Sequence, residues 1–317
     1  MQWGQIKSLF ILCFLVLNVF LVFQLIDRQE EELSFIPEPS REEELEFNIE
    51  GLDDLSEEQY EAPLVYAQSY EYNEVASNEL SNLPNQQSVV INDTTLFSRF
   101  EEPVSMPSSE DSEFRELFNQ MIYNGADYSF WKQFDQANLY VFVQEIEHPI
   151  FYNPNALLFV QTNDNGEIVQ YIQTQLIESE EDDESLDAQN LIQQYDAVYR
   201  LYHNTNTLES GDEITDVHLG YHNLVSLQTG EQLLNPTWHI EVNEQIDHFI
   251  NAIEGHDYPQ NEDFVSDNMN EFINFLTRSN GDHTIFYQLE DEDEEDELIE
   301  EMYQDWLTVQ ENLTEVE

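Results

Sequence analysis

The stretch "ALLFVQTNDNGEIVQYIQTQLI", residues 156–177, decides the fold class, because two apolar arms flank a tight turn. The turn is "TNDNG", in which asparagine and glycine tolerate the positive φ that hairpin turns require. The segment therefore predicts two antiparallel β-strands. Residues 163–167, "NDNGE", also match a short fragment of a calcium-binding loop, but a hairpin turn explains them better.

Helical and strand-like segments follow the same order on both sides of this hairpin. Before it, apolar residues at helical spacing in 110–123 precede the strand-like run "NLYVFVQEI". After it, a helical stripe in 188–202 precedes "ITDVHLGYHNLVSL", "LLNPTWHIEV" and "QIDHFINAI". The pattern predicts an α+β fold of two helix-plus-antiparallel-sheet subdomains, which follow a single N-terminal transmembrane helix.

Composition shifts divide the chain into seven predicted parts. They are a cytoplasmic stub (1–8), a transmembrane anchor (9–26), an acidic tether (27–62), a first α+β subdomain (63–177), an acidic linker (178–187), a second α+β subdomain (188–255) and an acidic extension (256–317). The extension contains two amphipathic segments, "FVSDNMNEFINFLTR" and "ELIEEMYQDWLTV". Whether these helices dock on the body or stay solvated is open from the sequence.

The N-terminal segment predicts a retained membrane anchor. From Leu9 to Ile26 no charged residue occurs, and this run makes about 27 Å of helix, against a hydrocarbon core of about 30 Å. The exit, "FQLIDRQEEEL", lacks the small residues of a signal-peptidase site, and Cys13 lies too early for a lipoprotein. We expect a single-pass protein of the cell membrane with a cytoplasmic N-terminus and an extracytoplasmic main domain.

The charge excludes several classes of partner. The chain has 68 acidic residues against 8 lysines and arginines, a formal net charge of −60. Such a surface is repelled by nucleic acid and by anionic lipid, so we expect no nucleic-acid partner. The acidity fits an extracellular face adapted to salty or alkaline surroundings, where salt screens self-repulsion.

No sequence motif nominates a catalytic residue, a metal ligand or a cofactor site. Phosphate-binding glycine loops, nucleophile elbows, CxxC pairs and HExxH helices do not occur. His218 and His222 are four residues apart, but they lie in a strand-like alternation, where that spacing is about 13 Å. We interpret both as ordinary exposed histidines rather than metal ligands.

The run "NPTWHI" predicts structure rather than binding. Pro236 is permitted at the start of a strand, where no hydrogen-bond donor is lost. Trp238 then shares a face with Ile240, which favours a core tryptophan of the second sheet over a ligand platform. Tyr171 and Tyr221 complete the set of structural core candidates.

Asn18 is the polar residue that needs an explanation within the predicted anchor. An amide without a partner in hydrocarbon costs several kcal/mol, and an interhelical hydrogen bond recovers about 0.6–2 kcal/mol. The alternatives are a contact with another protein's helix and a simply tolerated polar residue. On the first alternative, Phe14, Leu17, Leu21 and Leu25 form the surrounding packing surface.

Several segments together resemble one family. "MQWGQIKSLFILCFLVLNVFLVFQ", "GADYSFW", "LLFVQTNDNGEIVQYIQTQLI", "GDEITDVHLGY" and "LLNPTWHIEV…FINAIEG" are similar to segments of the YycI (WalI) family and occur in the same order. The resemblance covers Met1 to about Gly255. The high acidity and residues 256–317 depart from the family pattern.

The resemblance implies a non-enzymatic regulator of the WalK/WalR (YycG/YycF) two-component system, which controls the cell wall. The implied partners are the sensor histidine kinase WalK and the sibling protein YycH, reached through membrane-helix and ectodomain contacts. Two other hypotheses remain open: an extracytoplasmic domain that senses a ligand or cation, and an anchored cell-wall hydrolase. The latter would need a cleft with paired carboxylates, and the sequence nominates none.

Overall fold

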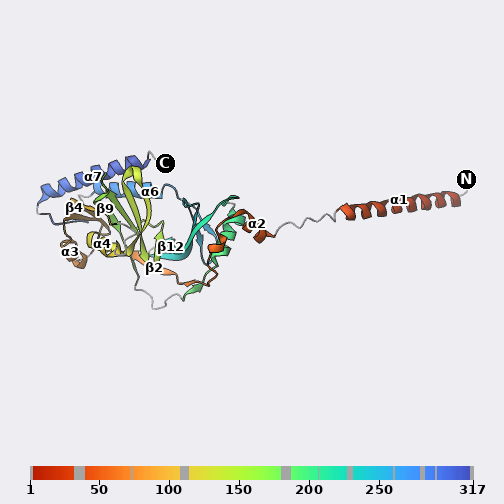
Figure 1. The fold of residues 1–317 in the computed structure, drawn as a ribbon, viewed down its shortest axis with the longest axis horizontal. Helices are drawn as coiled ribbons and strands as arrows, with labels where there is room; N and C mark the ends of the chain where they lie inside the picture. The colour runs from red at the N-terminus through yellow and green to blue at the C-terminus, as the bar shows by residue number, and fades with distance from the viewer. Residues whose placement is uncertain are drawn as a thin grey trace. The chain divides into compact units, whose positions relative to one another are not determined.

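The computed structural model describes residues 3–31, 40–72, 74–107, 114–179, 187–205, 207–226, 231–259, 261–278, 283–289 and 291–314. The chain forms two compact units, Met1–Asn48 and Ile49–Glu317. The fold is α+β with large sheets, and an N-terminal helix is present, as the sequence predicts (Figure 1).

The first unit contains α1 (Trp3–Glu31) and α2 (Arg41–Asn48). The predicted anchor falls inside α1, where large apolar side chains are exposed all along 10–23, from Phe10 at 73% to Val19 at 47%. Across the described residues, no helix is both long enough and apolar enough to span a membrane.

The second unit begins with a large antiparallel sheet in the order β16-β3-β4-β9-β8-β6-β5. Its strands are β3 (Gln86–Ile91), β4 (Thr95–Ser105), β5 (Tyr128–Phe134), β6 (Leu139–Ile146), β8 (Leu157–Thr162), β9 (Glu167–Thr174) and β16 (Thr284–Tyr287). Helices cover both of its faces. They are α3 (Glu74–Leu80) and α4 (Phe114–Met121) on one face, and α6 (Phe264–Thr277) and α7 (Glu292–Thr314) on the other.

The opening hairpin lies in this sheet as β8 and β9, and the predicted antiparallel pairing is confirmed. In the turn, Asn163 Oδ1 accepts hydrogen bonds from the backbone N–H groups of Asn165 and Glu167, at 2.9 and 3.1 Å, and Gly166 has φ +76°. The apolar residues of β8 are consecutive rather than alternating because the sheet is buried on both faces.

A second sheet has the order β10-β2-β13-β12-β7, with β14 paired to β13 and β15 paired to β14. Its strands are β2 (Val65–Ser69), β7 (His148–Phe151), β10 (Leu176–Glu178), β12 (Ile214–Ser226), β13 (Gln232–Val242), β14 (Ile246–Asn251) and β15 (Asp257–Tyr258). β7 pairs with β6 on one side and with β12 on the other, so it links the two sheets. β2, from the predicted first subdomain, lies beside β13, and β10 pairs with the other edge of β2.

The remaining elements are short. They are η1 (Leu52–Asp54), β1 (Glu61–Ala62), η2 (Gly125–Asp127), η3 (Asp135–Ala137), β11 (Gln189–Asn190), α5 (Gln194–Arg200) and the π-helical turn η4 (Leu201–Thr205). β1 and β11 form a separate antiparallel pair. The predicted linker 178–187 falls mostly outside the described residues.

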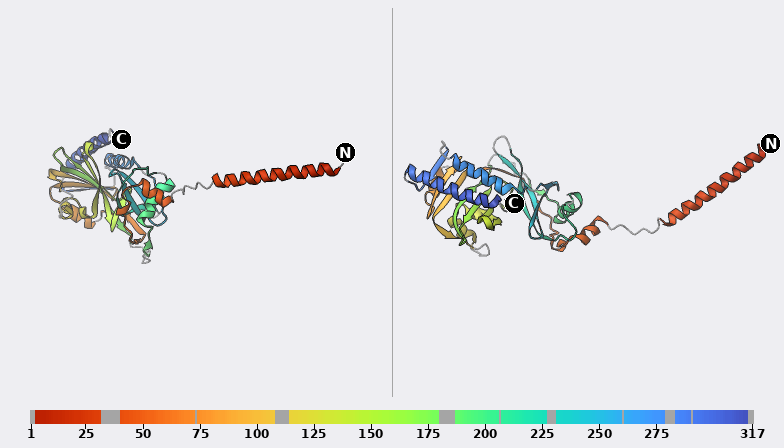
Figure 2. Two further views of the ribbon diagram at one scale, coloured as in Figure 1. Left: turned by 45° about the vertical axis from the view of Figure 1, so that its right-hand side comes forward. Right: turned by 90° about the horizontal axis from the view of Figure 1, so that it is seen from above.

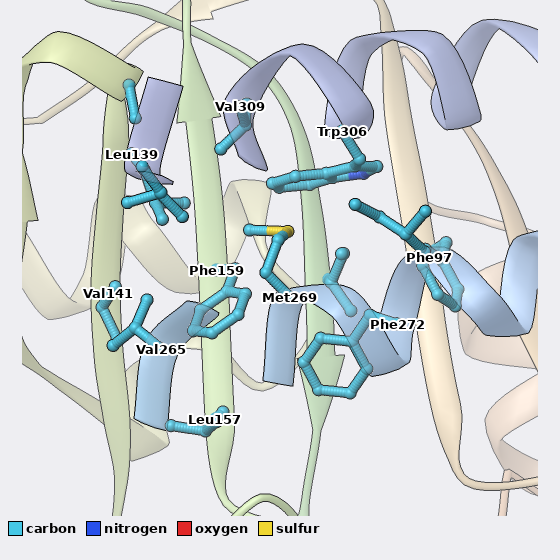
Figure 3. Packing of buried hydrophobic residues seen from close by; sticks show 14 of the residues in the cluster. Phe97, Leu139, Val141, Leu157, Phe159, Val265, Met269, Phe272, Trp306 and Val309 are labelled. Atoms are coloured by element: carbon cyan, nitrogen blue, oxygen red, sulfur yellow. The ribbon is translucent and has the colours of Figure 1, made fainter. Parts of the chain in front are cut away.

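The C-terminal extension packs against the large sheet, which decides the question that its amphipathic segments leave open. α6 and α7 run side by side across strands β4 and β9 (Figures 1 and 2), and β16 extends the sheet by pairing with β3. Figure 3 shows side chains of both helices directed at the sheet. Met269, Phe272, Trp306 and Val309 meet Phe97, Leu139, Val141, Leu157 and Phe159 in one buried cluster.

An ion-paired arginine adds to this contact. Arg99 of β4 donates a hydrogen bond to Asp305 of α7 at 2.6 Å and pairs with Glu301 at 3.2 Å. The helices α6 and α7 of this extension are therefore part of the core of the second unit, because their side chains bury one face of its large sheet.

Candidate functional site

A chain of polar side chains crosses the second sheet on neighbouring strands. His218 of β12 lies opposite His239 of β13, and its Nε2 is 3.0 Å from Nδ1 of His239. His239 is paired with Phe249, so Asp247, two residues before Phe249 on β14, is its diagonal neighbour. Asp247 Oδ1 is 2.7 Å from Nε2 of His239, and Asp216 Oδ2 is 3.2 Å from Nδ1 of His218.

Lys132 connects this chain to the large sheet. Its Nζ lies 2.8 Å from Oδ2 of Asp247 and 5.1 Å from the ring centroid of Trp131. The pairing of β5 with β6 shifts between Phe130 and Lys132, so Trp131 is the extra residue of a β-bulge. Bulges redirect side chains, and this one lies where Trp131 and Lys132 meet residues of the second sheet.

Aromatic rings surround the two histidines. Phe249 stacks on His239 with centroids 4.8 Å apart, and Phe151 lies 4.9 Å from the same ring and 6.0 Å from His218. A Cβ at Gly220 would lie 2.7 Å from the Phe151 ring, so glycine is required for this close approach. His239 is therefore almost fully buried, with 7% of its side chain exposed.

Burial and hydrogen bonding shift the pKa of Asp247 in opposite directions. Burial by itself raises the pKa of Asp247, but the hydrogen bonds from His239 and Lys132 outweigh it and lower the pKa to about 2. The carboxylate therefore stays ionised. Burial also lowers the pKa of His218, and the neighbouring His239 lowers it further. Asp216 and Asp247 raise that pKa by smaller amounts.

A pocket of about 230 Å³ opens beside Lys132 and Asp247. Its lining comes from the large sheet (Trp131), the second sheet (Asp247) and the N-terminal end of α6 (Phe264). No serine, threonine or cysteine lines it within the described residues. In covalent hydrolysis a histidine–aspartate pair activates a side chain of this kind.

His218 and His222 differ from the expected exposed histidines. His218 is hydrogen-bonded within the polar chain, and 39% of its side chain is exposed. His222 is half-buried and stacks on Tyr258, with ring planes 6° apart and centroids 4.1 Å apart. The expectation was wrong because it considered β12 alone, whereas the strand register brings His239 and Asp247 against it. Across the described residues, no group of His, Cys, Asp or Glu is placed to hold a metal ion.

The core candidates occupy buried positions. Tyr171, Tyr221, Trp238 and Ile240 have at most 1% of their surface exposed, and Pro236 is also buried. The Trp238 indole N–H donates to the backbone carbonyl of Ile192 at 2.9 Å, so its polar edge is satisfied inside the core.

Pro236 lies in the middle of β13 rather than at the start of a strand. On the side of β13 that faces away from β12, the pairing with β2 ends at Leu234 and the pairing with β14 begins at Thr237. Pro236 falls between these two partners, so its missing N–H leaves no ladder position empty. Its carbonyl still accepts a hydrogen bond from Ala252 N at 2.9 Å.

The predicted partner-binding residues lie on α1. Phe14, Leu17 and Leu21 are 64%, 53% and 50% exposed, and Asn18 between them is exposed. Their spacing puts them on one helix face. The side chain of Leu25 lies outside the described part of the structure.

The comparisons with known proteins decide the family. The model of the YycI protein family matches residues 41–253. This chain belongs to the YycI family. The match begins at the start of α2, includes β14 and ends before α6, so the resemblance stated from the sequence is confirmed over this range, and the extension lies outside the matched region. Members of the YycI family are membrane-associated regulators of the WalK two-component system.

Two further comparisons add little. No curated protein gave a significant match. Among solved structures, the Bacillus megaterium YpeB C-terminal domain matches with 13% identity and a TM-score of 0.32, covering 61% of this chain and 100% of that chain. A likeness at this TM-score carries no argument about fold or function.

Proposed function

We propose that this YycI-family protein is a non-enzymatic regulator of the sensor histidine kinase WalK and acts through contacts with the kinase and with YycH. The observation that carries the proposal is the family match over residues 41–253. The chemistry of the polar chain agrees with it, because no serine, threonine or cysteine stands among the described residues that line the pocket beside Asp247.

The proposal places α1 in the cell membrane as a single-pass anchor, with the N-terminus in the cytoplasm and the second unit outside. Its support is the run of apolar side chains along 10–23, which are about half to three-quarters exposed. Hydrocarbon is the solvent that accepts such a surface without a hydrophobic penalty.

Within the membrane, Asn18 would be the polar contact to a helix of another protein. A hydrogen bond of its amide across the helix interface stabilises such a pair by about 0.6–2 kcal/mol. Phe14, Leu17 and Leu21 would supply the packing on either side. Outside the membrane, the second unit would bias the kinase between its signalling states, a coupling of about 1–3 kcal/mol that is reciprocal between the partners.

Photo-crosslinking in native membranes tests these contacts. A crosslinker at Leu17, beside Asn18, is expected to capture WalK or YycH, identified by mass spectrometry. A crosslinker at Val16 is the matched control, because that position faces the opposite side of the same helix. The substitution Asn18→Leu should weaken capture. Equal capture from both positions, or unchanged capture with Asn18→Leu, would remove this face from the proposal.

The orientation has its own test. With Cys13 replaced by serine, cysteine introduced at Tyr60 should react with a membrane-impermeant reagent in whole cells, and cysteine introduced at Gln5 should not. The reverse pattern would overturn the proposed topology without affecting the family assignment.

A second candidate function is the sensing of a small extracytoplasmic ligand. The pocket of about 230 Å³ favours this function, because its lining residues come from both sheets and from α6. A ligand bound there would contact both sheets and α6 and so change how these elements pack against one another. Calorimetry with the full chain and calcium tests the cation form of this hypothesis. Saturable heat would support it, and its absence would leave protein contact as the mode of action.

A further inference from the structure

The polar chain on the second sheet lacks one proton. Asp216–His218, His218–His239 and His239–Asp247 are three contacts of 2.7–3.2 Å, and each needs one hydrogen between its two heavy atoms. Carboxylate oxygens only accept, and two neutral imidazoles carry one N–H each. Two hydrogens therefore serve three contacts. Whichever tautomers are present, one contact brings two acceptors together until a third proton binds.

The charges around the polar chain favour the binding of this third proton. From its own strand, β12, His218 faces Asp216. The residues facing it from neighbouring strands are His239 of β13 and Asp247 of β14, with Lys132 of β5 behind Asp247. The ring of Phe151 from β7 covers it without charge. Two carboxylates and one ammonium carry a net charge of −1, and a bound proton neutralises the group.

The same proton competes with Lys132 for Asp247. With both imidazoles neutral, the positive charge in contact with this carboxylate is that of Lys132, whose Nζ lies 2.8 Å from Oδ2 of Asp247. A protonated imidazole pair places a second positive charge 2.7 Å from Oδ1 of Asp247, while Lys132 holds Oδ2 at 2.8 Å. The ammonium and the imidazolium repel each other, so each is held less strongly at the carboxylate than it would be alone.

We propose that His218 and His239 together form a binding site for a single shared proton, and that its occupancy weakens the Lys132–Asp247 ion pair that joins the two sheets. The domain thereby carries an acid-responsive link at the wall of the pocket where β5, β14 and α6 meet. The sign agrees with linkage. Burial lowers the pKa of His218, so the unfolded chain takes up the proton more readily, and stability falls as the pH drops below about 6.5.

Histidine NMR of the full chain in detergent tests the shared site. The ring signals of His218 and His239 are expected to move together with one midpoint, and Asp216→Asn is expected to lower that midpoint. His283→Gln is the matched control. His283 also faces a carboxylate, Asp93 at 2.8 Å, but its side chain is 71% exposed and it does not belong to the polar chain of His218 and His239. Independent midpoints for the two rings, or no effect of Asp216→Asn, would overturn the shared proton.

Hydrogen exchange tests the link between the sheets. On acidification from about pH 7.5 to 5.5, and after correction for intrinsic rates, exchange in β5 and β14 should rise relative to β3. In Lys132→Met this pH-dependent difference should disappear, because the ion pair is already absent. His218→Gln, which prevents the shared proton, should also remove it while keeping the ion pair. A pH-independent ratio in the unmodified chain would overturn the coupling.

Discussion

The two sheets of the second unit differ in what covers them. The large sheet lies between two layers of helices, and each of its faces carries a buried apolar cluster, with Phe159 directed at α6 and Val160 at the opposite layer. The second sheet places Trp238 and Ile240 in the core on one face, but His218 and His239 on the other, where it meets β5 and β7. The helix-covered faces of the large sheet stabilise the fold, whereas the junction between the sheets carries groups that respond to pH.

Removal of the helix layer from the large sheet should have the largest effect on the fold. Truncation after Gly255 would expose the face of the large sheet that contains Phe97 and Phe159, and we expect loss of cooperative folding, measured by thermal unfolding and dye binding. Removal of residues 1–40 is the control, because they belong to the separate first unit. A truncated chain that unfolds with unchanged cooperativity would show that the extension is dispensable.

A single side chain measures the same contact more finely. Trp306 of α7 is fully buried against the large sheet, and Trp306→Ala should lower the free energy of unfolding by about 3–5 kcal/mol. Phe130→Ala serves as the control, because Phe130 is 48% exposed and its loss should cost much less. Denaturant titration measures both. Equal effects of the two substitutions would contradict the assignment of α7 to the core.

At the junction, Asp247→Asn should have an intermediate effect that depends on pH. The pKa of Asp247 is about 2 when folded and 3.8 in the unfolded reference, so its contribution is present above 3.8 and is lost as the pH falls through about 2. We expect a loss of about 2 kcal/mol at pH 7 and a flatter acid limb of the stability curve. Asp53→Asn, at an exposed side chain of η1 outside the polar chain, is the control. An unchanged acid limb would contradict the role of Asp247.

The smallest expected effect concerns the ion pairs between Arg99 and α7. Arg99→Gln should lower stability by at most about 1 kcal/mol, because Glu301 and Asp305 are 51% and 40% exposed. The loss should shrink at high salt, which screens exposed pairs. Urea titration at low and at molar salt measures it. A large, salt-independent loss would mean that Arg99, rather than the apolar cluster, holds α7.

The sequence predicted those parts of the fold that depend on neighbouring residues. The Asn163–Gly166 turn, the α+β class and the amphipathic pattern of residues 264–276 are local, because turn conformation and periodicity depend on a few adjacent side chains. The docking of α7 was open, because amphipathicity shows that a face must be covered but not which surface covers it.

The functional site was harder to predict than the fold. His218 was noticed, but Lys132, His239 and Asp247 carried no recognisable spacing, since they come from three different strands. The signal that existed was weak: Lys132 is one of 8 basic residues in a chain with 68 acidic ones. A scarce cation in an acidic chain is a candidate for a specific ion pair.

The sequence alone determined the class of the fold, the antiparallel hairpin at its centre and the family to which the chain belongs. Only the tertiary structure decided that the extension completes the large sheet through β16 and α7, and that Lys132 reaches Asp247. The reason is physical. Turn and periodicity signals act over a few residues, whereas strand register and the bulge at Trp131 bring together groups more than a hundred residues apart.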